Sequence, residues 1–183
     1  MTTESAIAVN GALVRYLDFM DVYWPRDICH PAENITVALA CVEEVNGDGA
    51  RLIEAVVAGY EAQIRLCDAF CFQDLGFHHA SAAGFVAPLV AGKAWGHSSA
   101  VMAQAGGVGG FRHMTLGVLS KGDLSMAKAA AYPLSASEGV SAARLASAGF
   151  TGPMAAYEWL FEQTGAKIDD YALDHDAYRI ERV

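Results

Sequence analysis

The sequence is poor in cationic residues. Its 183 residues include 12 Lys and Arg against 21 Asp and Glu, which gives a formal net charge of −9. Nucleic acids and anionic membrane surfaces are bound by clustered Lys and Arg, so we expect neither as a partner. Charged residues make up 18% of the chain and hydrophobic residues 54%, a balance typical of one packed globular domain and not of a disordered chain.

Long hydrophobic runs and metal-binding cysteine pairs are also missing. The longest apolar run, residues 82–91, is too short to cross a bilayer, and we expect no signal peptide. Cys29, Cys41, Cys67 and Cys71 do not have the spacing of a zinc site. Cys67 and Cys71 lie one helical turn apart and are expected to be buried thiols in a reducing compartment. We therefore expect a cytoplasmic protein without a bound metal.

Sustained period-two alternation is absent, and apolar residues recur instead at helical spacing. This pattern predicts an all-α fold of roughly seven helices in a compact domain. The expected helical segments are about 6–21, 31–45, 48–71, 80–95, one from 98 or 99 into a Gly-rich run at 105–110, one from 125, 135–149 and 151–164.

Local signals set the expected helix ends. The pair Asn46-Gly47 suits a left-handed cap, and Asp48 can cap the helix that follows. Pro133 is expected to break a helix, and Ser135 with Glu138 fits a capping box that would start the next one.

Glycines inside two helical segments call for a packing explanation. Gly59 lowers helix propensity, so we expect a neighbouring helix to approach closely there. The run at 105–110 lacks the GxGxxG register of a nucleotide loop and follows no strand. It is either a flexible connection or a tight packing point between helices.

An acid–base site is predicted where the first helix ends and the second begins. Asp18 and Asp21 share one face of the predicted first helix, and Arg15 lies one turn before Asp18. A Pro-containing loop then brings His30 to the start of the next helix. The same spacing fits a solvated helix end with a capping histidine, so it leaves both interpretations open.

Two more histidines, His78 and His79, lie just before another predicted helix. The positive end of a helix dipole disfavours imidazolium and keeps the ring able to accept a proton, and free N–H groups there can bind a carboxylate. Lys128, in the first turn of a later helix, would add a positive charge or simply be solvated. His113 is either a further site residue or a buried core histidine.

Five segments along the chain, in the same order, carry a resemblance to a known family. They read LDFMD (17–21) with HPAEN (30–34), GYEAQIRL (59–66), GFHH (76–79), HMTLG (113–117) and GDLSMAK (122–128), and GFTGP (149–153) follows them. Together they resemble the MmgE/PrpD family, which includes 2-methylcitrate dehydratase and cis-aconitate decarboxylase.

The resemblance implies a helical domain over residues 1–166, with residues 167–183 as an acidic tail at the start of a lid domain. It further implies a dehydratase that uses no metal or other cofactor and acts on a small di- or tricarboxylate. Such an enzyme abstracts a proton beside a carboxylate and expels hydroxide from the neighbouring carbon.

The same resemblance suggests roles for individual residues. His30 and His78 would act as the acid and the base, and Asp18 would have a hydrogen-bonding or orienting role. Lys128 would bind substrate, with Asp21, His79 and His113 as further substrate-binding candidates.

The chain also departs from the family. Family members are longer, with helices before the position of Met1 and a lid domain after the helical part. Val22 stands where Thr or a similar polar residue is common. The alternative expectation is therefore a non-catalytic truncated homologue or subunit that forms a homodimer or pairs with a lid-bearing chain. A decarboxylase or epimerase on the same scaffold is a further alternative, because these reactions share proton abstraction.

Overall fold

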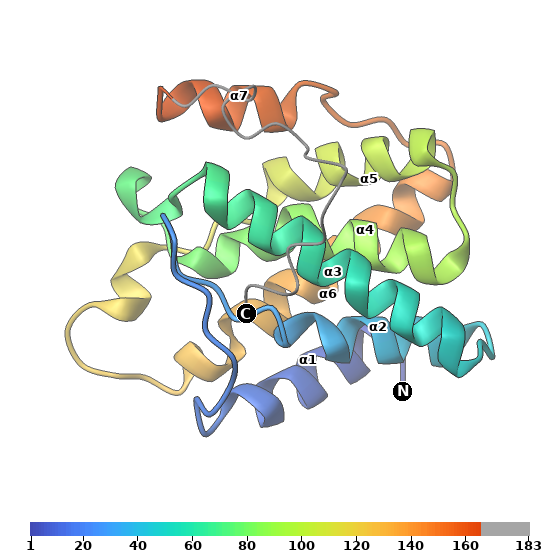
Figure 1. The fold of residues 1–183 in the computed structure, drawn as a ribbon, viewed down its shortest axis with the longest axis horizontal. Helices are drawn as coiled ribbons and strands as arrows, with labels where there is room; N and C mark the ends of the chain where they lie inside the picture. The colour runs from blue at the N-terminus through green and yellow to red at the C-terminus, as the bar shows by residue number, and fades with distance from the viewer. Residues whose placement is uncertain (166–183) are drawn as a thin grey trace.

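The computed structural model describes residues 1–165, and within them it confirms an all-α fold with seven α-helices and no strand. Figure 1 shows their arrangement. The α-helices are α1 (Thr3–Arg15), α2 (Glu33–Glu44), α3 (Gly49–Ala69), α4 (Ala83–Trp95), α5 (Ser99–Arg112), α6 (Ala127–Ser147) and α7 (Ala156–Gln163), and the short 3-10 helices are η1 (Phe72–Leu75), η2 (His79–Ala82) and η3 (Gly117–Ser120). None of these helices is long and apolar enough to cross a membrane. The predicted tail at 167–183 lies outside the described residues.

Helix α6 lies at the centre of the bundle, packed against α1, α4 and α5. The predicted break at Pro133 is wrong, because α6 runs through it without interruption. Pro133 packs against Gly11 of α1, where a Cβ would come within 2.5 Å of the proline Cβ. Tertiary packing here outweighs the local cost of a proline. The predicted capping box is wrong too, since the Ser135 hydroxyl lies 3.1 Å from that of Thr115.

The ends of α2 and the start of α3 confirm the local predictions. Asn46 adopts a left-handed φ of 52° just after α2. The Asp48 carboxylate accepts a hydrogen bond of 2.9 Å from the Arg51 N–H and so caps α3. Gly59 lies against Asn34 of α2, where a Cβ would come within 2.8 Å of the asparagine Cβ. The expected close helix approach is therefore present.

The Gly-rich run is a tight packing point and part of α5, which continues to Arg112. Gly106, Gly107, Gly109 and Gly110 are all buried. At Gly109 an added Cβ would collide with the backbone carbonyl oxygen of Gly84 in α4. The absence of side chains therefore lets α4 and α5 approach backbone to backbone.

We expect Gly109→Ala to lower the free energy of unfolding by about 2–3 kcal/mol, because backbone atoms cannot move aside as a flexible side chain does. Gly49→Ala is the matched control, since nothing lies within 4 Å of the position of its added Cβ at the first residue of α3. It should be neutral or slightly stabilising. Chemical denaturation measures both, and equal stability of the two variants would contradict the backbone contact.

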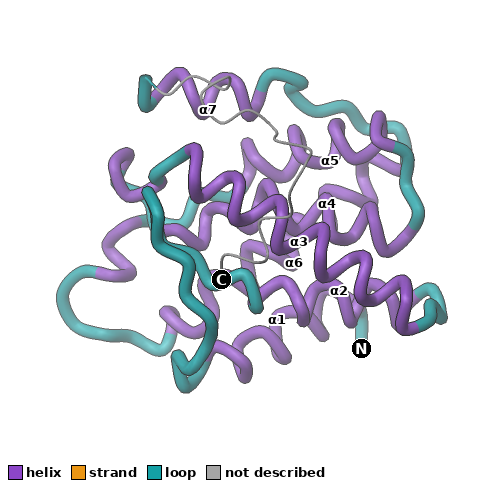
Figure 2. The backbone as a smooth tube through the Cα atoms, in the orientation of Figure 1, coloured by secondary structure: helices purple, strands orange, loops and turns teal. Residues whose placement is uncertain are grey.

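The end of the first helix differs from the prediction. α1 ends at Arg15, and Asp18 has a left-handed φ of 53°, so Asp18 and Asp21 do not share a helix face. Residues 16–32 instead form a loop in which Tyr23 and Cys29 exchange backbone hydrogen bonds of 3.0 and 2.8 Å. Figure 2 shows this loop beside the loop that precedes α6.

Candidate active site

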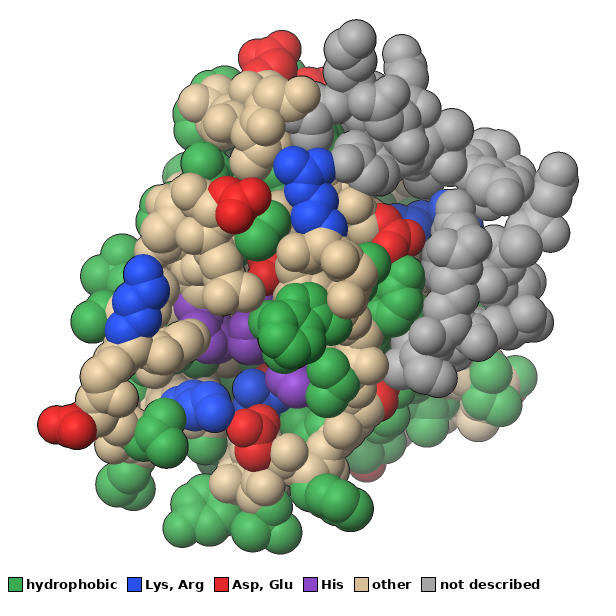
Figure 3. All heavy atoms as spheres, turned by 60° about the vertical axis from the view of Figure 1, so that its left-hand side comes forward, with side chains coloured by type: hydrophobic (Ala, Val, Ile, Leu, Met, Phe, Trp, Pro, Cys, Tyr) green, Lys and Arg blue, Asp and Glu red, His purple; other side chains and the backbone are tan. Residues whose placement is uncertain are grey.

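One end of the bundle brings together four separate parts of the chain. The end of α1, the start of α2, η2 and the start of α6 meet at the left-hand side of Figure 1. Figure 3 shows this side as a hollow in which His side chains are visible beside Lys or Arg and Asp or Glu groups. Polar chemistry is therefore concentrated where the loops of the domain converge.

Three imidazoles lie together at this end. The ring centroids of His30 and His79 are 5.5 Å apart, and those of His78 and His79 are 4.0 Å apart. All three side chains are buried. The structure thus brings His30 and His78, which are far apart in sequence, each into contact with the ring of His79.

Hydrogen bonds assign different tautomers to two of these rings in their neutral form. His30 Nδ1 lies 2.7 Å from the backbone oxygen of Asp21. A carbonyl oxygen can only accept, so Nδ1 carries the proton and Nε2 keeps a free lone pair. His78 Nδ1 accepts a hydrogen bond of 3.1 Å from the Ala80 N–H, so its Nε2 carries the proton. One ring offers an acceptor and the other a donor.

Burial and neighbouring cations keep these rings neutral. Burial, followed by the charges of Arg15 and Lys128, lowers the pKa of His78 from its ordinary 6.5 to about 4. Burial is also the main cause that lowers the pKa of His30, and it lowers the pKa of His79 strongly. All three imidazoles are therefore uncharged near neutral pH and able to take part in proton transfer.

Lys128 and Asp18 form an ion pair at the edge of the cluster. Lys128 Nζ is 3.0 Å from Asp18 Oδ2, and Arg15 Nε is 3.2 Å from Asp18 Oδ1. The hydrogen bond from Lys128 is the main cause that lowers the pKa of Asp18. The sequence pointed to each of these residues, but their contact joins segments 110 residues apart.

Asp21 and His113 have other surroundings. The Asp21 carboxylate accepts hydrogen bonds from the Ala32 N–H, at 3.1 and 3.2 Å, and from the Tyr60 hydroxyl, at 2.8 Å. It therefore anchors the start of α2. His113 ends α5, and its Nε2 lies 3.4 Å from a carboxylate oxygen of Glu138. His113 lines a different surface hollow from Lys128.

A buried polar network below His30 was not predicted. Asn34 donates to the side-chain oxygen of Gln63 and, at 3.1 Å, to the backbone oxygen of Pro31. The Tyr132 hydroxyl donates to Asn34 at 2.8 Å. These contacts join α2, α3 and α6, and they fix the residue that follows His30. No local sequence signal marks such a network.

Glu33 is a second unpredicted feature. Its side chain is buried, one oxygen lies 3.9 Å from Arg15 Nη1, and the other has no hydrogen-bond partner among the described residues. Burial raises the pKa of Glu33 to about 8. A neutral Glu33 provides no negative charge to compensate the positive charge of Arg15 at its Nη1 atom.

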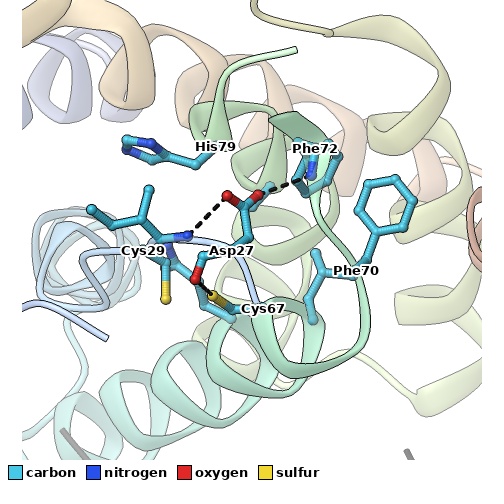
Figure 4. Close-up of a pocket in the computed structure, with 10 residues that line it drawn as sticks. Asp27, Cys29, Cys67, Phe70, Phe72 and His79 are labelled. Carbon is cyan, nitrogen blue, oxygen red and sulfur yellow. Dashed lines mark hydrogen bonds between the residues drawn. The ribbon is translucent and has the colours of Figure 1, made fainter. Parts of the chain in front are cut away.

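The loop that carries His30 is held by Asp27. Its carboxylate accepts hydrogen bonds from the N–H groups of Ile28 and Phe72 and from the Gln73 side chain, at 2.8, 2.9 and 2.8 Å. Figure 4 shows Asp27 beside a cavity bounded by Cys67 and His79. At about 10 Å³, this cavity is at the lower limit for one water molecule. The cavity lies next to His79 and is too small for a substrate.

The four cysteines are free thiols and all are buried, as expected for Cys67 and Cys71. Within residues 1–165, no three His, Cys, Asp or Glu side chains are grouped so that they could hold a metal ion.

Comparison with protein families identifies the family of the chain. The family description of the MmgE/PrpD N-terminal domain matches residues 1–171, which is most of the chain. The match includes every residue of the His cluster as well as Asp18 and Lys128. The chain therefore belongs to the MmgE/PrpD family.

Proposed function

We propose that this chain carries the acid–base part of a hydro-lyase site of the 2-methylcitrate dehydratase type, acting on a small di- or tricarboxylate. The observation that carries the proposal is the cluster of His30, His78 and His79 beside Lys128. Neutral imidazoles with complementary free nitrogens suit a reaction that removes one proton and needs a hydrogen bond to a leaving oxygen.

The tautomers suggest a division of roles. Nε2 of His30 would accept the proton from the carbon beside a substrate carboxylate. The Nε2–H of His78 would donate a hydrogen bond to the departing oxygen, as a neutral imidazole can do when its pKa is lowered. The C–H and C–O bonds break, a C=C bond forms, and the proton and hydroxide leave as water. The reaction is balanced without any change in oxidation state.

The cationic side of the cluster would bind the substrate carboxylates. Lys128 lies near the N-terminus of α6, and its charge acts on His78 and His79. Before substrate binds, Asp18 would orient Lys128 through their ion pair. A protein with net charge −9 can bind an anion here because the local field, and not the total charge, acts on the ligand.

An ultraviolet assay tests the proposal. With citrate or 2-methylcitrate as substrate, we expect absorbance from a double bond conjugated to a carboxylate to increase with time. The value of kcat/KM should fall as the pH drops through the lowered pKa of His30, because a protonated ring cannot act as base. Absence of turnover, both alone and with a chain that supplies the lid, would remove the proposal.

A second candidate is a non-catalytic subunit that forms a homodimer or pairs with a lid-bearing chain. It is favoured by large apolar side chains that are exposed in the loop after α1 and just before α6, namely Tyr16, Leu17, Phe19, Leu124 and Met126. Such exposed patches commonly mark contact surfaces. A clean monomer in light scattering, with no partner in pull-downs, would count against this candidate.

Decarboxylation and epimerisation share the proton abstraction step with dehydration. Release of CO₂ would identify a decarboxylase, and inversion of a substrate stereocentre would identify an epimerase.

A further inference from the structure

The carboxylate of Asp18 bridges two cations that come from different helices. One oxygen lies 3.2 Å from Nε of Arg15 at the end of α1, and the other lies 3.0 Å from Nζ of Lys128 at the start of α6. Each oxygen thus contacts one cation. Any carboxylate placed between these two groups could make the same pair of charge-assisted contacts.

Arg15 is held more firmly than Asp18. The Arg15 side chain is only 4% exposed, and its Nη1 also lies 3.9 Å from Glu33 and 3.7 Å from the Met20 sulfur. Asp18 is 45% exposed and lies beyond the helix end with a left-handed backbone. Its neighbour Phe19 is 94% exposed. The carboxylate is therefore the partner that can leave with the least disturbance of packing.

A hollow opens at this ion pair. It has a volume of about 250 Å³ and is lined by Arg15, Asp18, Ser125 and Lys128 together with apolar side chains. Pockets for drug-sized ligands measure roughly 300–1,000 Å³, so this hollow suits a smaller molecule. The hydrogen bond with Lys128 and the charge of Arg15 keep Asp18 ionised at neutral pH. The hollow thus contains two cations that share the single negative charge of Asp18.

We propose that Asp18 is an internal ligand of the Arg15–Lys128 cation pair, and that a substrate carboxylate binds by taking its place. The identity of that carboxylate rests on the proposed function. The exchange adds Arg15 as a second binding residue and makes Asp18 a competitor of the substrate carboxylate, because Asp18 must leave before the carboxylate binds. The ligand class is a small polycarboxylate, one of whose carboxylates bridges the guanidinium and the ammonium group.

Binding of propane-1,2,3-tricarboxylate tests this exchange, because that ligand has no hydroxyl and cannot be dehydrated. We expect Asp18→Asn to bind it about tenfold more tightly than the wild type in calorimetry, since one competing charge is removed. Asp123→Asn is the matched control, because Asp123 is exposed in the loop before α6 and its substitution changes the net charge equally. Its affinity should stay within about twofold of wild type.

Further variants test whether Lys128 and Arg15 are the cations that bind the tricarboxylate. In the Asp18→Asn background, Lys128→Gln should abolish the gain, and Arg15→Lys should reduce it because the guanidinium fork is lost. Circular dichroism confirms that each variant is folded. Weaker or unchanged binding by Asp18→Asn overturns the exchange even if the protein dehydrates its substrate. Tighter binding by Asp18→Asn without any turnover retains the exchange and rejects the proposed function.

Discussion

Replacing His78 with asparagine is expected to lower kcat for dehydration by about 10²–10⁴-fold, the usual contribution of a positioned acid or base. His78 caps η2 by accepting a hydrogen bond from the Ala80 N–H. Asparagine is among the best N-cap residues, so the variant keeps the local backbone contact while losing the imidazole. The loss of rate would then report on the ring and not on the fold of η2.

The matched control is His97→Asn. His97 is half-buried just beyond the C-terminal end of α4, whereas His78 lies before its start. A helix of 13 residues separates them by about 20 Å. We expect kcat of this variant to stay within about twofold of wild type, because no proton transfer passes through His97. If His78→Asn is as active as His97→Asn, the His cluster does not perform the chemistry.

The helical architecture was predictable because its signals are local. Asp48 caps α3 and Asn46 takes the left-handed position after α2, and both effects act within a few residues. The close approach at Gly59 was also predictable, because a glycine inside a helix costs helix propensity and so points to packing.

The end of α1 and the continuity of α6 could not be predicted locally. Tyr16, Leu17 and Phe19 continue the apolar pattern of α1, yet they lie exposed in the loop. The loop is set by contacts such as those of Asp27 with Phe72, 45 residues away. Pro133 remains helical because it packs against Gly11 of α1. Both outcomes depend on tertiary contacts that no local pattern records.

The sequence singled out residues that the structure brings together, but it did not predict the contacts between them. The histidines were identified by their positions before helices and by the family motifs. The bridging of Arg15 and Lys128 by Asp18 was not, nor was the burial of Glu33. Such contacts join residues distant in sequence. The signal nearest to a prediction was the spacing of Arg15 one turn before Asp18, and that ion pair does form.

The lowered pKa of His78 also predicts how stability depends on pH. The ring has a pKa of about 4 in the folded protein and an ordinary value of 6.5 when unfolded. Between these values the unfolded state binds a proton that the folded state does not. The contribution of His78 to stability is therefore fully present above pH 6.5 and is lost as the pH falls toward 4. The loss amounts to about 3 kcal/mol.

Urea denaturation of the wild type and of His78→Asn at several pH values measures this effect. Other groups, such as Asp18 and Glu44, also lose stabilising interactions in acid, since ion pairing lowers their pKa values. These groups are present in both proteins, so their contribution cancels in the comparison. The wild type should lose about 3 kcal/mol more than the variant between pH 6.5 and 4. Parallel pH profiles would mean that burial does not lower the pKa of His78 in the folded protein.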